Sequence, residues 1–206
     1  MLLIETAPTA RRLTTVAAVR EALGMPSSPS DGVILAAIDS ASAAIEVFCR
    51  RPFGRGEYRE TFTCGELPRS GEILPERFPV VPESVEIEEA GVEIDAENWL
   101  FAQVTQSLYR LREDGSRRYW SVTPLIVRYT AGYLLPGEED RDLPIEIEAA
   151  CQREIQAGLA MRDRDPLVRQ EDVAGVGSTS YWVPGAETTL LTRQAEALLS
   201  AYIKFV

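Results

Sequence analysis

The stretch VRYTAGY at residues 127–133, followed by an acidic loop and then LPIEIEAACQREI at residues 143–155, decides the fold of this chain. The first segment alternates apolar and polar residues, which is typical of a β-strand. The second begins with Leu143 and Pro144, and proline fits the first turn of a helix because its missing N–H has no partner there. Apolar residues then recur every four positions, namely at Ile147, Cys151, Ile155 and Leu159. The sequence predicts a sheet followed by a long helix over residues 143–165, which ends near Asp165 because Pro166 disfavours helical backbone before it.

Two helices are predicted in residues 13–53. Thr14 or Thr15 can cap the first helix, and Gly24 lies at the position where a left-handed residue closes it. Ser30 or Asp31 can cap the second. Its apolar residues step by four, three, four and three positions, namely Ile34, Ile38, Ala41, Ile45 and Phe48. Residues 1–12 show weak periodicity, and we expect a mobile arm or an interface strand there.

Residues 55–133 change to period two and predict a β-rich section between the second and third long helices. Ala90-Gly91 and Asp114-Gly115 each lie between two apolar segments, which indicates two hairpins. We expect one compact sheet here rather than a sandwich. The spacing predicts a further helix that begins near Thr188 or Thr189 and shares an apolar face, namely Leu191, Ala195, Leu198, Tyr202 and Phe205. The expected fold class is α+β, with a mainly helical core of about four helices in a single domain over residues 1–206.

Composition excludes several classes of protein. The formal net charge of -11 argues against a protein that binds the phosphate backbone of nucleic acids, because such binding needs clustered cations. Residues 1–9 lack the features of a secretory signal, and no segment approaches the roughly 18 apolar residues that a membrane span needs. Three cysteines at wide spacing, Cys49, Cys64 and Cys151, indicate reduced thiols rather than a zinc site or a disulfide framework. We therefore expect no cofactor and no metal.

Catalytic chemistry has little support in the residue types. The chain has no histidine, which removes Ser-His-Asp and Cys-His nucleophiles. A Ser-Lys pair would depend on Lys204 near the end of the chain. The densest acidic run, Glu138, Glu139, Asp140 and Asp142, lacks the order of a calcium loop, and we interpret it as a solvated loop beside a helix N-terminus. Carboxylate or metal chemistry in the β section remains an alternative.

Three weaker patterns favour structural interpretations. Gly175-Val176-Gly177 lacks the third glycine of a dinucleotide loop and is interpreted as a connector. Arg117-Arg118 before Tyr119-Trp120 can mimic a platform for single-stranded nucleic acid, but strand patterning favours core packing. The third pattern is a group of glutamates, which we interpret as the solvent-exposed face of a strand and its turn, namely Glu86, Glu88 and Glu89.

Taken together, these segments resemble the head-tail connector, or adaptor, proteins of long-tailed bacteriophages and gene transfer agents. LTTVAAVREALGM at 13–25 is similar to the first helix of that family, AAIDSASAAIEVFCRRPF at 36–53 to the second, and VTPLIVRYTAGY with LPIEIEAACQREI to the strand-to-helix junction. GVGSTSYW and ALLSAYIKF are similar to the tail and the last helix. The chain departs from the family in the long β-rich insertion at 55–118 and in a less basic ending.

The resemblance implies a structural virion protein and no enzyme. Adaptors of this family form a ring of about twelve subunits under the portal, bind the stopper or tail-completion protein, and let DNA pass without specific binding. It implies assembly in the host bacterial cytoplasm, a place at the head-tail interface of the virion, and no contact with a membrane. We expect portal binding through the tail from Gly175 and through the last helix, namely Leu190, Leu191, Leu198, Leu199, Tyr202 and Phe205. Ring contacts are expected at charged residues, namely Arg50, Arg51, Glu138, Glu139 and Asp142.

Two alternatives to an adaptor stay open at this point. One is a small phage enzyme that depends on carboxylates or a metal. The other is a different component of the connector, such as a stopper or a tail terminator, although the two N-terminal helices favour the adaptor.

Overall fold

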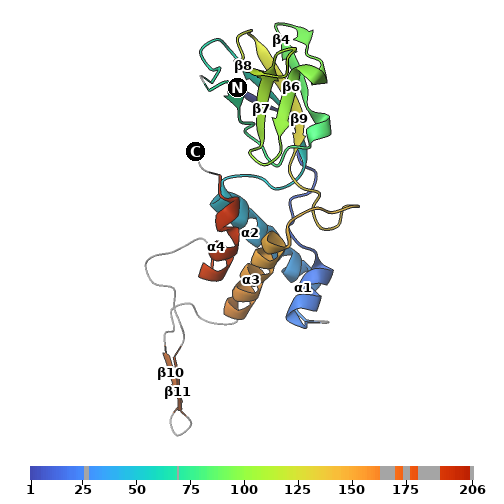
Figure 1. Cartoon of the computed structure of the whole chain (residues 1–206). Helices are drawn as coiled ribbons and strands as arrows, with labels where there is room; N and C mark the ends of the chain where they lie inside the picture. The colour runs from blue at the N-terminus through green and yellow to red at the C-terminus, as the bar shows by residue number, and fades with distance from the viewer. Residues whose placement is uncertain (26–27, 69, 163–169, 174–176, 181–190, 205–206) are drawn as a thin grey trace. The chain divides into compact units, whose positions relative to one another are not determined.

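The structure is a computed structural model that describes residues 1–25, 28–68, 70–162, 170–173, 177–180 and 191–204 (Figure 1). The chain divides into two compact units. The β unit comprises Met1–Ala10 and Phe53–Leu134, and the helical unit comprises Arg11–Pro52 and Leu135–Val206. The predicted α+β class is confirmed, since antiparallel strands occupy the middle of the chain between the helices. One adaptor domain over the whole chain stays a prediction.

The first sheet of the β unit is five-stranded and antiparallel. Its order is β1 (Leu2–Thr6), β2 (Gly56–Phe62), β9 (Leu125–Ala131), β4 (Glu86–Glu89) and β5 (Val92–Glu93). The longest register joins β2 to β9, from Gly56 opposite Ala131 to Phe62 opposite Leu125. Strand β9, which contains most of the VRYTAGY stretch, is thus the central strand and pairs with β2 on one side and β4 on the other.

The second sheet holds β3 (Glu72–Ile73), β7 (Ser107–Leu111) and β6 (Trp99–Ala102) in that order, and β8 (Arg117–Arg118) also pairs with β7. Two short 3-10 helices, Pro82–Ser84 and Ala96–Asn98, lie between strands. The hairpin prediction is confirmed at both places. Ala90 and Gly91 have φ of 50° and 85° in the turn from β4 to β5, and Gly115 has φ of 77° between β7 and β8.

One hydrophobic core joins the two sheets, so the expectation of a single compact sheet is wrong. Side chains of both sheets and of the loops between them are buried together, namely Tyr58, Ile73, Val80, Val85, Ile87, Ile94, Leu108, Trp120, Leu125, Val127, Tyr129 and Ala131. The β unit is therefore built as two facing sheets. Period-two patterning shows that each strand has one apolar face, but it does not show which strands share a sheet.

The expectation of a mobile arm or interface strand at the start of the chain is also corrected. Leu2–Thr6 pairs with β2 of the same chain, with Leu3 opposite Arg59. Apart from Leu2, its residues are exposed, which explains why the sequence there shows so little periodicity. Strand β1 lies at one edge of the five-stranded sheet.

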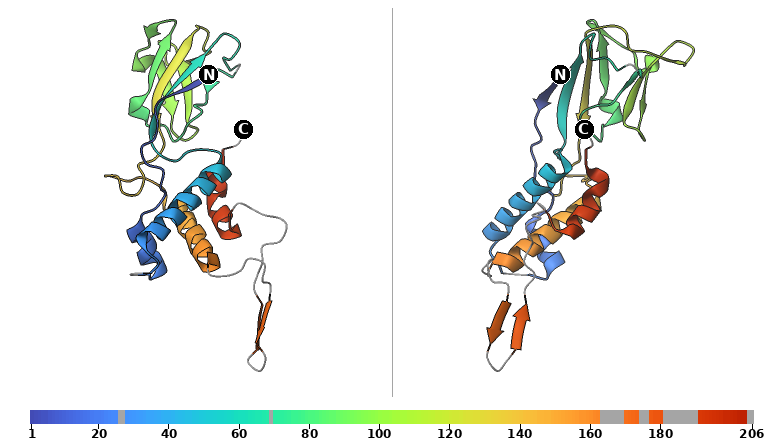
Figure 2. Two further views of the ribbon diagram at one scale, coloured as in Figure 1. Left: turned by 180° about the vertical axis from the view of Figure 1, so that it is seen from behind. Right: turned by 90° about the vertical axis from the view of Figure 1, so that its left-hand side faces the viewer.

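The helical unit contains α1 (Val16–Leu23), α2 (Asp31–Cys49), α3 (Ile145–Arg162) and α4 (Arg193–Leu199), followed by a 3-10 turn at Ser200–Tyr202. Helix α3 packs against both α2 and α4 (Figure 2). The cap of α1 is confirmed, because Thr15 accepts a hydrogen bond from the Ala18 N–H at 3.2 Å and Gly24 closes the helix with φ of 61°. A separate hairpin pairs β10 (Gln170–Val173) with β11 (Gly177–Ser180).

The apolar faces predicted for α2 and α3 are buried in large part. Ile34, Ile38, Ala41 and Ile45 of α2 and Ile147, Cys151 and Ile155 of α3 are less than a tenth exposed. The last helix begins later than predicted, at Arg193, because Thr192 caps it by accepting from the Ala195 N–H. The predicted end of α3 near residue 165 lies outside the described residues.

Helix α2 corrects the expectation that no segment approaches a membrane span. Among the described residues, α2 alone is long and apolar enough to cross a membrane by length and composition. The core helix of a soluble protein passes the same test. Its isoleucines at 34, 38 and 45 are fully buried within the helical unit, which favours the core-helix interpretation.

Candidate functional site

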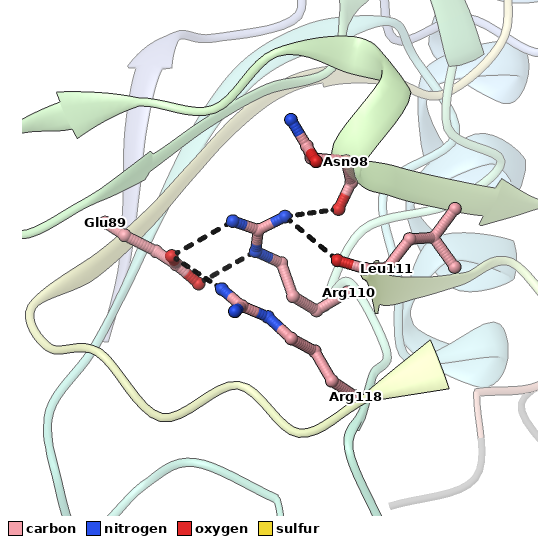
Figure 3. A network of polar contacts seen from close by, with 5 residues as sticks. All are labelled: Glu89, Asn98, Arg110, Leu111 and Arg118. Atoms are coloured by element: carbon pink, nitrogen blue, oxygen red, sulfur yellow. Dashed lines mark hydrogen bonds and ion pairs between the residues drawn. The ribbon is translucent and has the colours of Figure 1, made fainter. Parts of the chain in front are cut away.

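A buried cluster of charged side chains links the two sheets of the β unit (Figure 3). Glu89 of β4 accepts from Arg110 of β7, with Oε1 3.2 Å from Nε, and lies 3.7 Å from Nη2 of Arg118 on β8. Arg110 also donates to the carbonyl oxygens of Asn98 and Leu111. About a tenth of each side chain of the Glu89–Arg110 pair is exposed. Glu89 and Arg110 are bonded to other groups of the same unit, so we interpret this cluster as a clamp between the two sheets and not as a catalytic centre.

This clamp corrects one prediction and qualifies another. Glu89 is buried, whereas the sequence interpretation placed it on the solvent-exposed face of its strand. Of the other two glutamates in that interpretation, Glu86 is exposed and Glu88 is half-buried. Core packing is confirmed for Trp120, which is 4% exposed, but Tyr119 is 66% exposed. The guanidinium of Arg117 lies 3.7 Å from the ring centre of Tyr109, so this cation stacks on an aromatic side chain of its own sheet.

A second buried network fixes a loop of the β unit. Tyr129 donates its hydroxyl to Glu60, which also accepts from the Glu76 N–H at 2.6 Å. The Tyr129 oxygen accepts in turn from the Arg77 N–H at 3.1 Å. Burial raises the pKa of Glu60, and burial next to this carboxylate raises the pKa of Tyr129. Both shifts favour the protonated forms of Glu60 and Tyr129. The hydrogen bonds from the Glu76 and Arg77 N–H groups attach residues 76–77 to the sheet.

The helical unit has its own buried polar contacts. Glu148 in the first turn of α3 accepts from the Thr14 hydroxyl at 3.0 Å and from Arg141 Nη1 at 2.9 Å. Ser42 of α2 accepts from the Leu13 N–H and lies 3.8 Å from the Cys151 sulfur. Burial raises the pKa of Cys151 to about 12 and that of Cys49 to about 11. Thiols held protonated in this way make poor nucleophiles.

The acidic loop before α3 is folded back on itself. The Glu138 carboxylate accepts from the Leu135 N–H, and Asp140 has φ of 57°. Glu139, Asp140 and Asp142 are exposed. Within the described parts of the chain, no group of three or more histidine, cysteine or acidic side chains could hold a metal ion. The loop fits the interpretation of a solvated acidic segment beside a helix.

The residues expected to bind a portal lie on or near α4, and the described ones pack inside the unit to different extents. Leu191 and Leu199 are buried, while Leu198 and Tyr202 are half-buried. The Tyr202 hydroxyl donates to the Glu146 carboxylate at 3.3 Å. Leu190 and Phe205 lie outside the described residues. Their role in portal binding stays a prediction.

The residues expected at ring contacts come from two segments of the helical unit, the end of α2 and the acidic loop before α3. Arg50 is exposed and ends α2 with φ of 55°, whereas Arg51 is 5% exposed. Glu138, Glu139 and Asp142 belong to the acidic loop of the same unit. Their role between subunits is likewise untested.

Sequence reasoning missed the two buried networks of the β unit. A signal existed for Glu89, because it stands two residues after Ile87 and therefore on the same face of β4. Glu60 likewise stands two residues after Tyr58 on β2. No comparable signal marks Arg110 as the partner of Glu89, since the pairing depends on how the two sheets face each other.

Comparison with solved structures finds the same fold in particle necks. The chain is similar to one titled "Neck of native GTA particle computed with C12 symmetry", with a TM-score of 0.56, 18% identity, and coverage of 100% of this chain and 96% of that chain. A second, from the neck of an empty GTA particle computed with C6 symmetry, has a TM-score of 0.55 at the same identity and coverage. No protein-family model and no curated protein matches the chain. At this identity, the likeness shows a shared fold.

Proposed function

We propose that this chain is a structural protein of the particle neck, a head-tail adaptor that forms a ring under the portal and connects the DNA-filled head to the stopper or tail. The observation that carries the proposal is the fold. Its match to a neck subunit spans both units and 100% of the chain. The order of the sequence segments that resemble adaptors supports the same role, and that likeness spans most of the chain as well.

The surface chemistry supports a ring through which DNA passes. A chain with formal net charge of -11, repeated around a closed ring of about twelve copies, gives a channel that repels phosphate and does not retain DNA. The neck structure computed with C12 symmetry supports that copy number by analogy of fold. The ring belongs at the head-tail interface of a virion or gene transfer agent and assembles in the host cytoplasm.

The proposed partners are the portal on one side and a stopper or tail-completion protein on the other. The portal contact is assigned to the end of the chain, with Leu198 and Tyr202 as its accessible described residues. Leu191 and Leu199 are buried in the helical unit, so deletion of this segment would also remove part of its core. Substitution of the half-buried residues is therefore the cleaner way to disturb this contact.

An enzyme is the weaker alternative, and the role proposed here is non-enzymatic. The buried carboxylates Glu60, Glu89 and Glu148 are bonded to neighbouring protein groups. A stopper or tail terminator is the other alternative. The helices α1 and α2, which precede all strands but β1, favour the adaptor.

Electron microscopy of the full chain mixed with DNA-filled, portal-bearing, tail-less heads tests the proposal. We expect added ring density at the portal vertex, and weaker occupancy for the variant L198D/Y202A. A matched control is A201D, which places a charge on an exposed residue of the same turn and should bind as the wild type does. Heads that bind no chain at saturating concentration would contradict the adaptor role.

A further inference from the structure

The outer face of the five-stranded sheet presents two arginines side by side. The strand registers place Leu3, Arg59, Arg128 and Glu86 in one row across β1, β2, β9 and β4. Alternation along β2 and β9 puts Tyr58 and Tyr129 on the opposite, core-facing side. Arg59 and Arg128 are therefore direct cross-strand neighbours of like charge, a pairing that is unfavourable unless carboxylates compensate it.

Only one member of this pair has such compensation among the described residues. Arg128 lies 3.3 Å from the Glu88 carboxylate and 3.9 Å from that of Glu5. Arg59 is half-buried, and its Nε is buried with no hydrogen-bond partner in the described part of the chain. A partner from outside the chain would therefore have to bond Arg59 through the terminal nitrogens of its guanidinium. Leu3 beside it is 46% exposed, which gives this site an apolar rim.

We propose that Arg59 receives the Glu139 carboxylate of a neighbouring copy of this chain, an inference that rests on the ring proposed above. A closed ring needs two different faces that fit each other, because a face that meets itself gives a two-fold dimer. Carboxylates on the Arg59 face itself, such as Glu57 and Glu86, can only supply the two-fold arrangement. The partner of Arg59 must therefore come from another part of the molecule.

The acidic loop of the helical unit has the complementary charge and a defined shape. Glu139 and Asp140 are adjacent, exposed carboxylates. Their loop is held by the bond from the Leu135 N–H to Glu138, by the pairing of Pro136 with Glu138, and by the ion pair of Arg141 with Glu148. A loop ordered in advance loses little conformational entropy on binding. Its Glu139 can form a charge-assisted hydrogen bond with an arginine that lacks one.

Charge reversal on each side, and on both together, tests this pairing in the full-length chain. Sedimentation velocity over rising protein concentration gives the association constant of wild type, R59E, E139R and R59E/E139R. Each single variant replaces an attraction by a repulsion, and we expect about a tenfold lower association constant. The double variant restores the attraction with reversed signs and should return close to wild type. Asp140 is left in place because its positive φ makes substitution a backbone perturbation.

Two matched controls carry the same changes of charge elsewhere. R11E reverses an exposed arginine of the helical unit, and E97R reverses an exposed glutamate of the β unit. Both should associate as the wild type does. A second measurement uses a short bis-maleimide crosslinker on the C64S/R59C/E139C variant, because Cys49 and Cys151 are buried. A heterologous contact gives a ladder of dimers, trimers and larger products, whereas either cysteine alone gives at most dimers.

The outcomes separate this contact from the ring itself. A wild type that stays monomeric at every concentration and gives no crosslinked ladder overturns the ring and the contact together. A wild type that associates while R59E and E139R associate equally well leaves the ring standing and overturns the contact. Weakened single variants that the double variant fails to rescue show that the two side chains do not pair.

Discussion

The two units of this chain stabilise their interiors in different ways. In the β unit, charged side chains cross from one sheet to the other, as Glu89 does with Arg110. In the helical unit, α2 and α3 contribute buried isoleucines, and the neutral pair Ser42 and Cys151 makes a polar contact between them. Glu148, a buried charge of this unit, lies at the start of a helix. The facing sheets are thus joined by a buried ion pair, whereas α2 and α3 bury isoleucines and carry their buried charge at a helix start.

The largest effect should come from removal of one partner in the β-unit clamp. R110M leaves the Glu89 carboxylate buried without its main partner, and we expect about 3–5 kcal/mol of lost stability. Urea unfolding followed by tryptophan fluorescence measures it, because Trp99 and Trp120 lie in this unit. The double variant E89L/R110M removes both charges and should recover most of the loss. A single variant as stable as wild type would show that the clamp contributes nothing.

A loss of somewhat smaller size is expected from a cavity in the helical unit. I155A removes a side chain that is 1% exposed and should cost about 2–4 kcal/mol in unfolding followed by circular dichroism of the helices. I145A on the same helix is the control, since Ile145 is 70% exposed and its loss should cost less than about 0.5 kcal/mol. Equal losses for the two variants would contradict the described packing of α3.

The helix caps allow a finer comparison within the helical unit. Thr15 accepts from the Ala18 N–H, whereas the Ser30 side chain makes no capping bond to α2. T15A should therefore cost about 1 kcal/mol of unfolding free energy, and S30A much less. Thermal unfolding of the two variants at one pH gives the difference. The opposite ranking would show that the caps are assigned to the wrong residues.

The smallest effect is a pH dependence that arises from Glu60. Burial raises its pKa in the folded chain above the ordinary value of 4.5, so the folded state holds the proton to higher pH than the unfolded state does. This contribution to stability is present below pH 4.5 and is lost as the pH rises through the folded-state pKa. E60Q, which cannot titrate, should remove that decline from a series of urea unfolding curves. An unchanged pH profile in E60Q would place the decline in another group.

Local signals in the sequence predicted much of the fold. Four-residue spacing located α2 and α3, and Thr15, Gly24 and Gly115 marked a cap, a helix end and a hairpin, because each of these features depends on residues close in sequence. The facing sheets and the pairing of Leu2–Thr6 with β2 were missed because sheet pairing depends on partners more than fifty residues away. The start of α4 was placed too early, since Thr188, Thr189 and Thr192 are equally suitable caps by residue type.

The candidate sites were harder to predict for a related reason. The apolar spacing that suggested a docking face at Leu191 and Leu199 is the same spacing that buries a helix on its own unit. That Arg59 has no partner among the described residues follows from sheet register and from where neighbouring carboxylates lie. Sequence alone shows a charged residue on an alternating strand and no more.

The most direct test of the central claim is the composition of particles made without this gene. Electron microscopy should then show DNA-filled heads that lack tails, and expression of the chain in trans should restore tailed particles. Tailed, infectious particles that form at the normal yield without the gene would contradict a role as the connecting ring.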